Sequence, residues 1–358
     1  RVQHRGFSRE LRHELGAVFR RCLVAAREHN ADLVTIGGDL WEDEHVTPDT
    51  RRFVASELKD LDLPVLMICG NHDPYLAGGS YARSAWPANV QISRHDVVTE
   101  FRFDSVSVWA ISWLGGRLEM GFLDTFATPK DSRTHLLLAH GTAVRPGDPY
   151  SDSAAAPFDP ERVAHSGFAL CLAGHVHAGG QIGPLVYPGS PEPLGWGEMG
   201  RHAVILVDVG DRTARVTFLD VNMRRYVLRE IDCEDAASSA AVEQRVREAL
   251  TDPDPASVYL RLDLKGLIAS DCDVDTRALE EMYRGDYAAL QIRDHTFPEY
   301  DLRALERQNT ATGHFVRSLQ ARIDQIQITE AAERSDLELA VRLGLHALHG
   351  RKELIHVG

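Results

Sequence analysis

Four short polar motifs stand directly after apolar runs, and their residue types could bind metal ions. They are Gly38-Asp39, Gly70-Asn71-His72-Asp73, His140-Gly141 and Gly174-His175-Val176-His177. Carboxylate, amide and neutral imidazole groups supply the oxygen and nitrogen ligands that suit manganese, iron or zinc. Because the carboxyl ends of strands in a layered α/β sheet meet at one edge, the four motifs are expected to converge there. Two histidines one residue apart, His175 and His177, could serve two neighbouring ions if the backbone between them is extended.

Each motif taken alone also has a structural interpretation. A Gly-Asp pair after a strand is usually a turn, and Asn-His-Asp could be a turn whose asparagine adopts the left-handed conformation. His140 alone could be a hydrogen-bonded core histidine. All four motifs in this order, each at the end of an apolar run, favour the metal-site interpretation over four separate turns.

The apolar patterns around the motifs predict the elements that must position them. Short apolar runs at residues 33–36 and 65–69 indicate buried strands. Helices are predicted after Ser8 and over residues 48 to about 61, from apolar residues recurring every three or four positions. This alternation is typical of a βαβ layered sheet.

Length and composition limit the function classes. The chain has 358 residues and a formal net charge of -14, and this length suggests two domains or one large domain with an appendage. Net acidity argues against a surface that coats nucleic acid throughout, but it permits a local basic groove. Five dispersed cysteines without a Cys-x-x-Cys motif argue against a disulfide framework and favour a cytoplasmic setting. No apolar run approaches the roughly 18 residues of a membrane span, so no membrane partner is expected.

The ordered motifs resemble those of the calcineurin-like metallophosphoesterase superfamily over about residues 8–230. Within it, the chain looks most like the SbcD-type DNA-repair exonucleases. That narrower resemblance rests on Gly38-Asp39-Leu40-Trp41, on the Val-Tyr-Pro-Gly-Ser-Pro-Glu stretch at residues 186–192, and on an α/β segment that follows. It implies a calcineurin-like αββα sandwich over residues 1–232 and a C-terminal α/β capping domain with helices over residues 233–358.

The resemblance also implies roles for individual residues around two divalent ions, most characteristically manganese. Asp39 would bridge both ions, His72 would protonate the leaving group, and Glu42 would orient His72 and favour its protonated form. The remaining implied ligands are Asn71, His140 and His175 on one ion and His177 on the other. The family's first motif, Asp-x-His, is not found before the first predicted helix, and we expect it to lie upstream of Arg1.

The resemblance therefore implies a two-metal DNA phosphodiesterase, a repair exonuclease acting at double-strand ends. The partners that the resemblance implies are DNA, an SbcC-type coiled-coil ATPase docking on the C-terminal helices, and a second copy of the chain in a homodimer. Two alternatives stay open: a metallophosphoesterase for a small substrate such as a nucleotide or phosphomonoester, and an inactive scaffold that binds an ATPase partner. The apolar residues of the last two helices could instead pack onto the capping domain.

Overall fold

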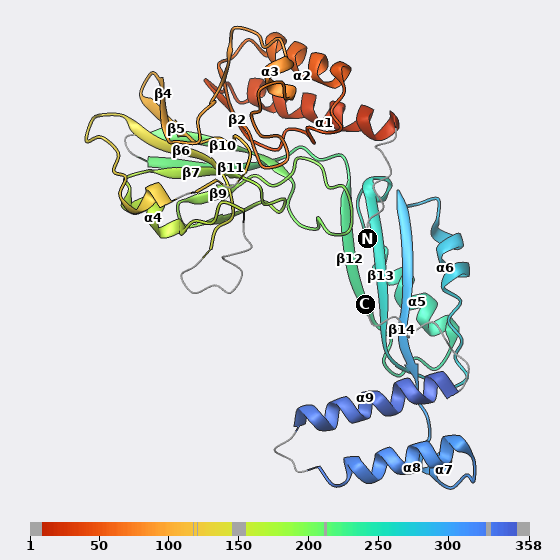
Figure 1. Ribbon diagram of the computed structural model, residues 1–358. Helices are drawn as coiled ribbons and strands as arrows, with labels where there is room; N and C mark the ends of the chain where they lie inside the picture. Colours follow the sequence, from red (N-terminus) through yellow and green to blue (C-terminus); the bar gives the residue numbers. More distant parts are fainter. Residues whose placement is uncertain are drawn as a thin grey trace. The chain divides into compact units, whose positions relative to one another are not determined.

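The computed structural model describes residues 9–116, 118–119, 121–144, 155–210, 213–326 and 331–348. It divides into two compact units, Arg1–Arg224 and Arg225–Gly358 (Figure 1). The division falls one strand before the boundary after residue 232 that we expected, because β12 (Arg225–Asp232) pairs in parallel with β13 (Val258–Ile268) of the second unit. None of the described helices combines the length and apolarity needed to cross a bilayer.

Two helices and a small parallel sheet form the first half of unit 1. The sheet has the order β1-β2-β3, with β1 (Val34–Gly37), β2 (Val65–Ile68) and β3 (Val90–Ile92). The helices α1 (Arg9–Glu28) and α2 (Pro48–Leu61) lie side by side (Figure 1). Pro48 starts α2, and the Thr47 side chain caps it by accepting from Thr50 N. The apolar face of α2 and Leu23 of α1 pack on the outer face of the sheet. The α2 residues in this core are Val54, Leu58 and Leu61, and they pack with Val65, Met67 and Cys69.

A six-stranded sheet forms the second half of unit 1, in the order β4-β5-β6-β7-β9-β8. Its strands are β4 (Thr99–Phe103), β5 (Val106–Ala110), β6 (Thr134–His140), β7 (Leu170–Gly174), β8 (Gly180–Ile182) and β9 (Leu185–Tyr187). The central neighbours β5, β6, β7 and β9 run parallel, and β4 and β8 pair antiparallel at the edges. β6 is buried along its whole length, as expected of a strand covered on both faces.

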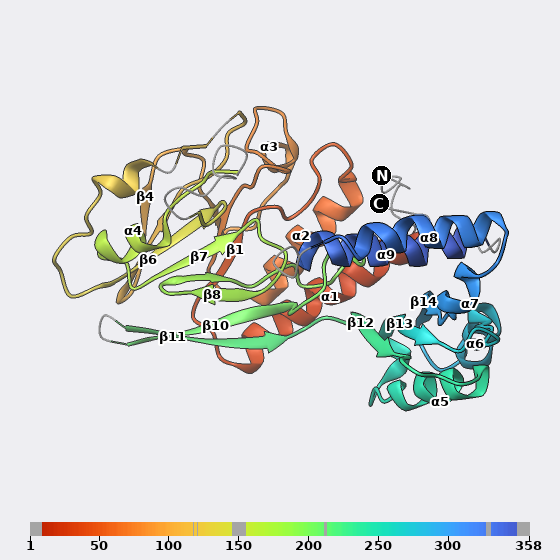
Figure 2. The ribbon, with the colours of Figure 1, turned by 90° about the horizontal axis from the view of Figure 1, so that it is seen from below.

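The two sheets of unit 1 face each other across one apolar core. Ile68 of the first sheet meets Val108, Leu138 and Leu172 of the second. The outer face of the second sheet is covered by α4 (Pro160–His165), the 3₁₀ helix η1 (Gly121–Asp124) and neighbouring loops. The layers thus run helix, sheet, sheet, helix, which confirms the predicted αββα sandwich. The short helix α3 (Ser80–Arg83) follows β2, and the hairpin β10 (Ala203–Gly210) and β11 (Thr213–Asp220) follows the second sheet (Figure 2).

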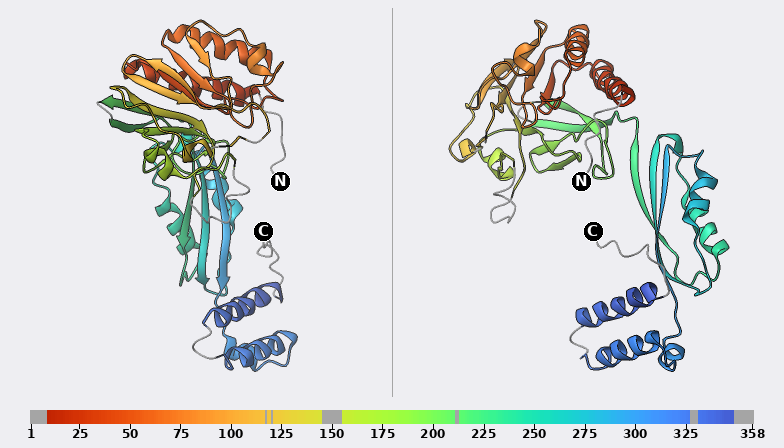
Figure 3. Two further views of the ribbon diagram at one scale, coloured as in Figure 1. Left: turned by 60° about the vertical axis from the view of Figure 1, so that its left-hand side comes forward. Right: turned by 45° about the vertical axis from the view of Figure 1, so that its right-hand side comes forward.

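Unit 2 is a three-stranded parallel sheet with helices. Its order is β12-β13-β14, and β14 spans Ala289–Pro298. α5 (Ser239–Ala249), η3 (Pro255–Ser257) and α6 (Thr276–Tyr283) connect the strands, and α5 and α6 share a core with alternate residues of β13. The chain continues through α7 (Leu302–Glu306), α8 (Ala311–Ile323) and α9 (Ala331–Leu348), seen in both views of Figure 3. Val316, Ile323, Val341 and Leu345 form a small core between α8 and α9, so these helices bury much of their apolar surface against each other.

Candidate metal centre

Four of the predicted ligands converge where the two sheets of unit 1 meet. Asp39 follows β1, Asn71 follows β2, His140 ends β6 and His175 follows β7. One ligand atom from each of Asp39, His140 and His175 lies within 4.8 Å of the others. The Oδ1 atom of Asn71 joins them, 2.9 Å from His140 Nε2 and 3.1 Å from His175 Nδ1. The structure therefore brings together the set assigned from the sequence to one ion.

The hydrogen bonds around His140 show that this cluster suits a cation. His140 Nδ1 lies 2.7 Å from the Gly37 carbonyl oxygen, which can only accept, so Nδ1 carries a proton. Nε2 then faces Asp39 Oδ2 at 3.1 Å and Asn71 Oδ1 at 2.9 Å. One nitrogen and two oxygens, all of which can coordinate a metal, thus face one another. A divalent cation stabilises such an arrangement, and this nitrogen–oxygen set suits a first-row transition metal.

The protonation states of two ligands also favour metal binding. Burial alone would raise the pKa of Asp39, but the contact with His140 and the hydrogen bond from His72 N hold it below its ordinary value. Burial, with the neighbouring His140, lowers the pKa of His175. An ionised carboxylate and a neutral imidazole are the forms that coordinate metals.

Glycines let the two sheets approach closely beneath the cluster. A Cβ at Gly174 would lie 2.0 Å from the Gly37 carbonyl oxygen and 2.7 Å from His140 Nδ1, and a Cβ at Gly70 would lie 2.1 Å from Asp39 Oδ1. Asp39 itself has a φ of 51°, and His175 has a φ of 93°. Such backbone strain in non-glycine residues costs about 1–3 kcal/mol each and is concentrated at functional sites.

Asp73, the last residue of the Gly-Asn-His-Asp motif, ties the loops after β1 and β2 together. It is fully buried. Its Oδ1 accepts from Asp39 N at 3.0 Å and Gly70 N at 2.7 Å, and its Oδ2 accepts from Leu40 N at 2.7 Å and the Tyr81 hydroxyl at 2.8 Å. Burial raises the pKa of Asp73 to about 6 in spite of these donors. The sequence analysis gave Asp73 no role; the structure makes it the anchor of both ligand-bearing loops.

His72 and Glu42 form the exposed pair that the sequence analysis assigned to proton transfer. His72 Nδ1 lies 3.0 Å from Glu42 Oε1, and the two side chains are 50% and 49% exposed. The backbone N–H of His72 donates to Asp39 Oδ1 at 3.0 Å, which fixes the residue beside the carboxylate of the cluster. The His72 side chain is not part of the donor cluster, so it is free to meet a substrate.

His177 is not in the group of Asp39, His140 and His175, whose ligand atoms lie within 4.8 Å of one another. The backbone from residue 175 to 178 bends instead of running extended, so the extended geometry on which the sequence argument for two neighbouring ions depended is absent. His177 Nδ1 contacts Glu198 Oε1 at 2.8 Å. This bond raises the pKa of His177, and it lowers the pKa of Glu198 against the opposing effect of burial.

The stretch at residues 186–192 supports the loops that bear histidines. The buried Tyr187 hydroxyl donates to Gly141 O at 2.8 Å and accepts from Ala143 N at 3.0 Å. Ser190 N donates to His177 O at 2.9 Å. The sequence analysis did not identify Glu198, because a glutamate in a glycine-containing loop has no characteristic spacing. Asp73 belongs to the Gly-Asn-His-Asp motif, so its presence there was the signal that could have identified it.

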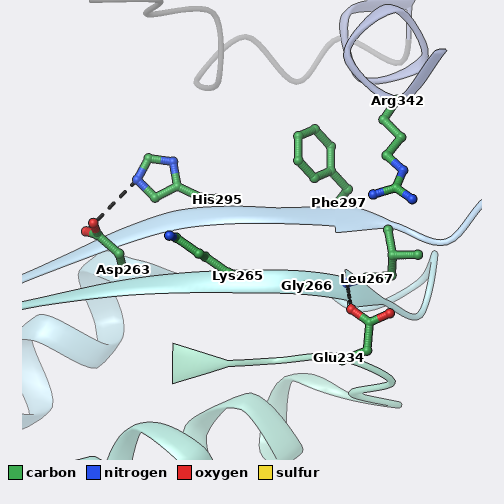
Figure 4. Close-up of a pocket in the computed structure, with 8 residues that line it drawn as sticks. All are labelled: Glu234, Asp263, Lys265, Gly266, Leu267, His295, Phe297 and Arg342. Atoms are coloured by element: carbon green, nitrogen blue, oxygen red, sulfur yellow. Dashed lines mark hydrogen bonds and ion pairs between the residues drawn. The ribbon is translucent and has the colours of Figure 1, made fainter. Parts of the chain in front are cut away.

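A cavity of about 590 Å³ lies in unit 2, and none of its lining residues is a predicted site residue (Figure 4). It is bounded by β13, β14 and Arg342 of α9. Three of its charged side chains make contacts with neighbouring groups: Asp263 Oδ1 lies 4.0 Å from His295 Nε2, Lys265 pairs with Glu230, and Glu234 accepts from Leu267 N at 2.7 Å. The chemistry suggested by the sequence therefore stays with the cluster in unit 1.

Comparison with known families agrees with this geometry. A family model described as calcineurin-like phosphoesterase matches residues 9–179, a range that contains Asp39, Asn71, His140, His175 and His177. No curated protein matches the chain. The family hydrolyses phosphoesters with divalent metals, as the candidate site would require. Residues 9–179 thus form a calcineurin-like phosphoesterase domain.

Proposed function

We propose that this chain is a manganese-dependent DNA phosphodiesterase, an exonuclease that hydrolyses phosphodiester bonds at double-strand ends. The proposal rests on the difference in exposure between the more buried donor cluster and an exposed rim, formed by His72, Glu42 and His177. His140 is fully buried, whereas His72, Glu42 and His177 have side chains that are 50%, 49% and 53% exposed. An open rim admits a polymer strand as well as a small ester, and it presents a proton donor at the surface that the strand would cross.

The proposal assigns separate tasks to the residues of the site. Asp39, Asn71, His140 and His175 would hold one ion, and Asp39 and His177 the other. When bound, two such cations polarise a phosphoryl oxygen and activate water for in-line attack.

His72 acts on the leaving group. With Nδ1 bonded to Glu42, its Nε2 is free to face the leaving oxygen of the scissile bond. Glu42 accepts a hydrogen bond from the Nδ1–H group of His72 and fixes the orientation of the ring. A nucleotide alkoxide is a poor leaving group, and proton donation to it is worth about 10²–10⁴-fold in rate.

The experiment is cleavage of an end-labelled linear duplex, with a covalently closed circle of the same sequence as the substrate without ends. We expect degradation of the linear DNA only when manganese is added, with the circle left intact. Cleavage should fall steeply between 50 and 200 mM salt, because each neutralised phosphate contact releases counterions. Asp39→Ala is the inactive control.

Two results would redirect the proposal. Rapid hydrolysis of bis-p-nitrophenyl phosphate with no cut in linear duplex would favour the small-substrate phosphoesterase. No hydrolysis of either substrate with manganese, cobalt or zinc would favour the scaffold.

The proposal includes two protein partners, an SbcC-type coiled-coil ATPase and a second copy of the chain. Leu339 and Leu348 of α9 are 46% and 49% exposed, and these leucines could contribute to a helix–helix contact. Light scattering of the full chain measures the homodimer directly, and a mass of one chain at micromolar concentration would exclude it. Replacing both leucines by glutamate should abolish co-elution with the ATPase and leave manganese-dependent hydrolysis unchanged.

A further inference from the structure

His177 is fixed through one ring nitrogen. Its Nδ1 lies 2.8 Å from Glu198 Oε1, and an ionised carboxylate can only accept a hydrogen bond. Nδ1 therefore carries a proton in this contact. In the neutral ring the other nitrogen, Nε2, has a free lone pair, and the ring can rotate only by breaking the bond to Glu198.

Glu198 is itself held in place. Its side chain is 18% exposed, and its Oε2 accepts from Leu194 N at 2.9 Å and from the Ser190 hydroxyl at 3.4 Å. Its backbone oxygen accepts from Nε2 of the buried His202 at 2.6 Å. Both carboxylate oxygens thus have partners, and the side chain has little freedom to swing away from His177.

The loop that carries Glu198 also returns to the backbone of His177. Ser190 N donates to His177 O at 2.9 Å. Gly189 has a φ of 79°, and a Cβ there would lie 2.6 Å from the same oxygen. The segment from residue 189 to 202 therefore contacts His177 at both its backbone and its ring.

We propose that Glu198 is a positioning residue for the second divalent ion: it holds the imidazole of His177 with Nδ1 protonated and Nε2 directed to the metal. This inference rests on the proposed function, because it takes His177 as a metal ligand. Carboxylates that orient ligating histidines fix the tautomer and raise ligand basicity, and their loss typically costs 10–100-fold in metal affinity. Glu198 would act through His177 and not touch the substrate.

The competing explanation is that Glu198 only stabilises its own loop. The bonds from Leu194 N and Ser190 would serve that purpose without any effect on His177. The two explanations differ in what they predict for the ring of His177 and for a protein that lacks this histidine.

The test uses the full chain labelled with ¹⁵N at histidine, and His177→Ala identifies the His177 signals by their loss. In the metal-free wild-type protein we expect the Nδ1–H tautomer at alkaline pH, where the imidazole is neutral. Glu198→Ala should shift His177 toward a mixture of tautomers, and Glu198→Gln, which keeps an acceptor oxygen, should lie between them. Glu44→Ala, which removes an exposed carboxylate two residues after Glu42, should leave the His177 signals unchanged.

Zinc titration of the same samples supplies the metal readout, because coordination moves the ¹⁵N shift of the ligating nitrogen and zinc is diamagnetic. We expect the His177 Nε2 shift to respond to added zinc, at about 10–100-fold higher zinc concentrations in Glu198→Ala. The ion held by Asp39, Asn71, His140 and His175 should keep its affinity. In a His177→Ala background, Glu198→Ala should cause no further loss of zinc.

The outcomes separate the inference from the function on which it rests. A His177 Nε2 signal that never responds to zinc would remove His177 as a ligand and with it this inference, while DNA cleavage would still test the function separately. A zinc response and tautomer that are the same in Glu198→Ala as in wild type would overturn the positioning role. An equal loss of zinc on adding Glu198→Ala to His177→Ala would show that Glu198 acts on the loop alone.

Discussion

Gly174→Ala adds one methyl group at the point where the two sheets of unit 1 meet. The new carbon would lie 2.0 Å from Gly37 O and 2.7 Å from His140 Nδ1. Carbon atoms essentially never approach such atoms within 3.0 Å, so backbone or ligand must move by roughly 1 Å in a close-packed interior. The φ of Gly174 is not positive, so alanine brings no backbone strain of its own. The effect would come from the collision alone.

The collision should affect both the stability of the protein and its rate of hydrolysis. Overpacking a core costs about 1–3 kcal/mol, occasionally more, and we expect about 3 kcal/mol because the nearest atom belongs to the backbone. The Gly37 carbonyl accepts from His140 Nδ1, so the same collision displaces a ligand. A misplacement of about 1 Å costs about 10²-fold in rate, and we expect at least that loss together with weaker metal binding.

Gly180→Ala is the matched control, in β8 of the same sheet. Its Cβ would have no atom within 4 Å, and its φ is not positive. It should be as stable as wild type or up to about 1 kcal/mol more stable, since alanine restricts the unfolded chain. The assays are urea unfolding, manganese content and manganese-dependent phosphodiester hydrolysis. If Gly174→Ala matched Gly180→Ala in all three, the close approach of the sheets would not set the ligand geometry.

Four further predictions follow from single contacts. His72→Asn should slow hydrolysis by about 10²–10⁴-fold with unchanged manganese content, whereas Asp39→Ala should lose metal and activity together; manganese loss in His72→Asn would make His72 a ligand. The chain should hold one manganese ion tightly through four ligands and a second weakly through Asp39 and His177, and metal analysis showing two equally tight ions would contradict this. Tyr81→Phe removes the hydroxyl that donates to Asp73 at 2.8 Å and should lower the free energy of unfolding by about 1.5–3 kcal/mol, measured in urea; an unchanged midpoint would show that this bond does not stabilise the loops. Burial raises the pKa of Glu192, so its carboxyl stabilises the folded state below its unfolded pKa and loses that contribution as pH rises through its folded pKa. The free energy of unfolding of Glu192→Gln should therefore rise relative to that of wild type from acid to neutral pH. A difference between the two proteins that is constant with pH would refute the shift.

The sequence predicted buried strands and the convergence of four polar residues at their ends, and the resemblance supplied the αββα layers of unit 1. The apolar runs before Asp39, Asn71, His140 and His175 predicted buried strands, and the ends of parallel strands must meet at one edge. β12 pairs within the second unit, so the division falls one strand earlier than the boundary expected after residue 232. β12 joins the second unit because it pairs with β13. The residues of a strand do not by themselves show which sheet the strand joins.

The contacts that support the predicted ligands could not be read from spacing, because they join segments that are far apart in the sequence. Asp73 receives hydrogen bonds from Asp39 and Leu40, more than thirty positions earlier, and Glu198 lies 21 positions after His177. A carboxylate in such a role has the same sequence signature as one in a turn, since its partners are backbone N–H groups or a distant ring. The metal ligands themselves are easier to find because several of them must follow strands in a fixed order. The geometry of a metal site thus depends on residues that only the folded chain identifies, and Asp73 and Glu198 are the positions at which a change should alter ligand geometry without removing a ligand.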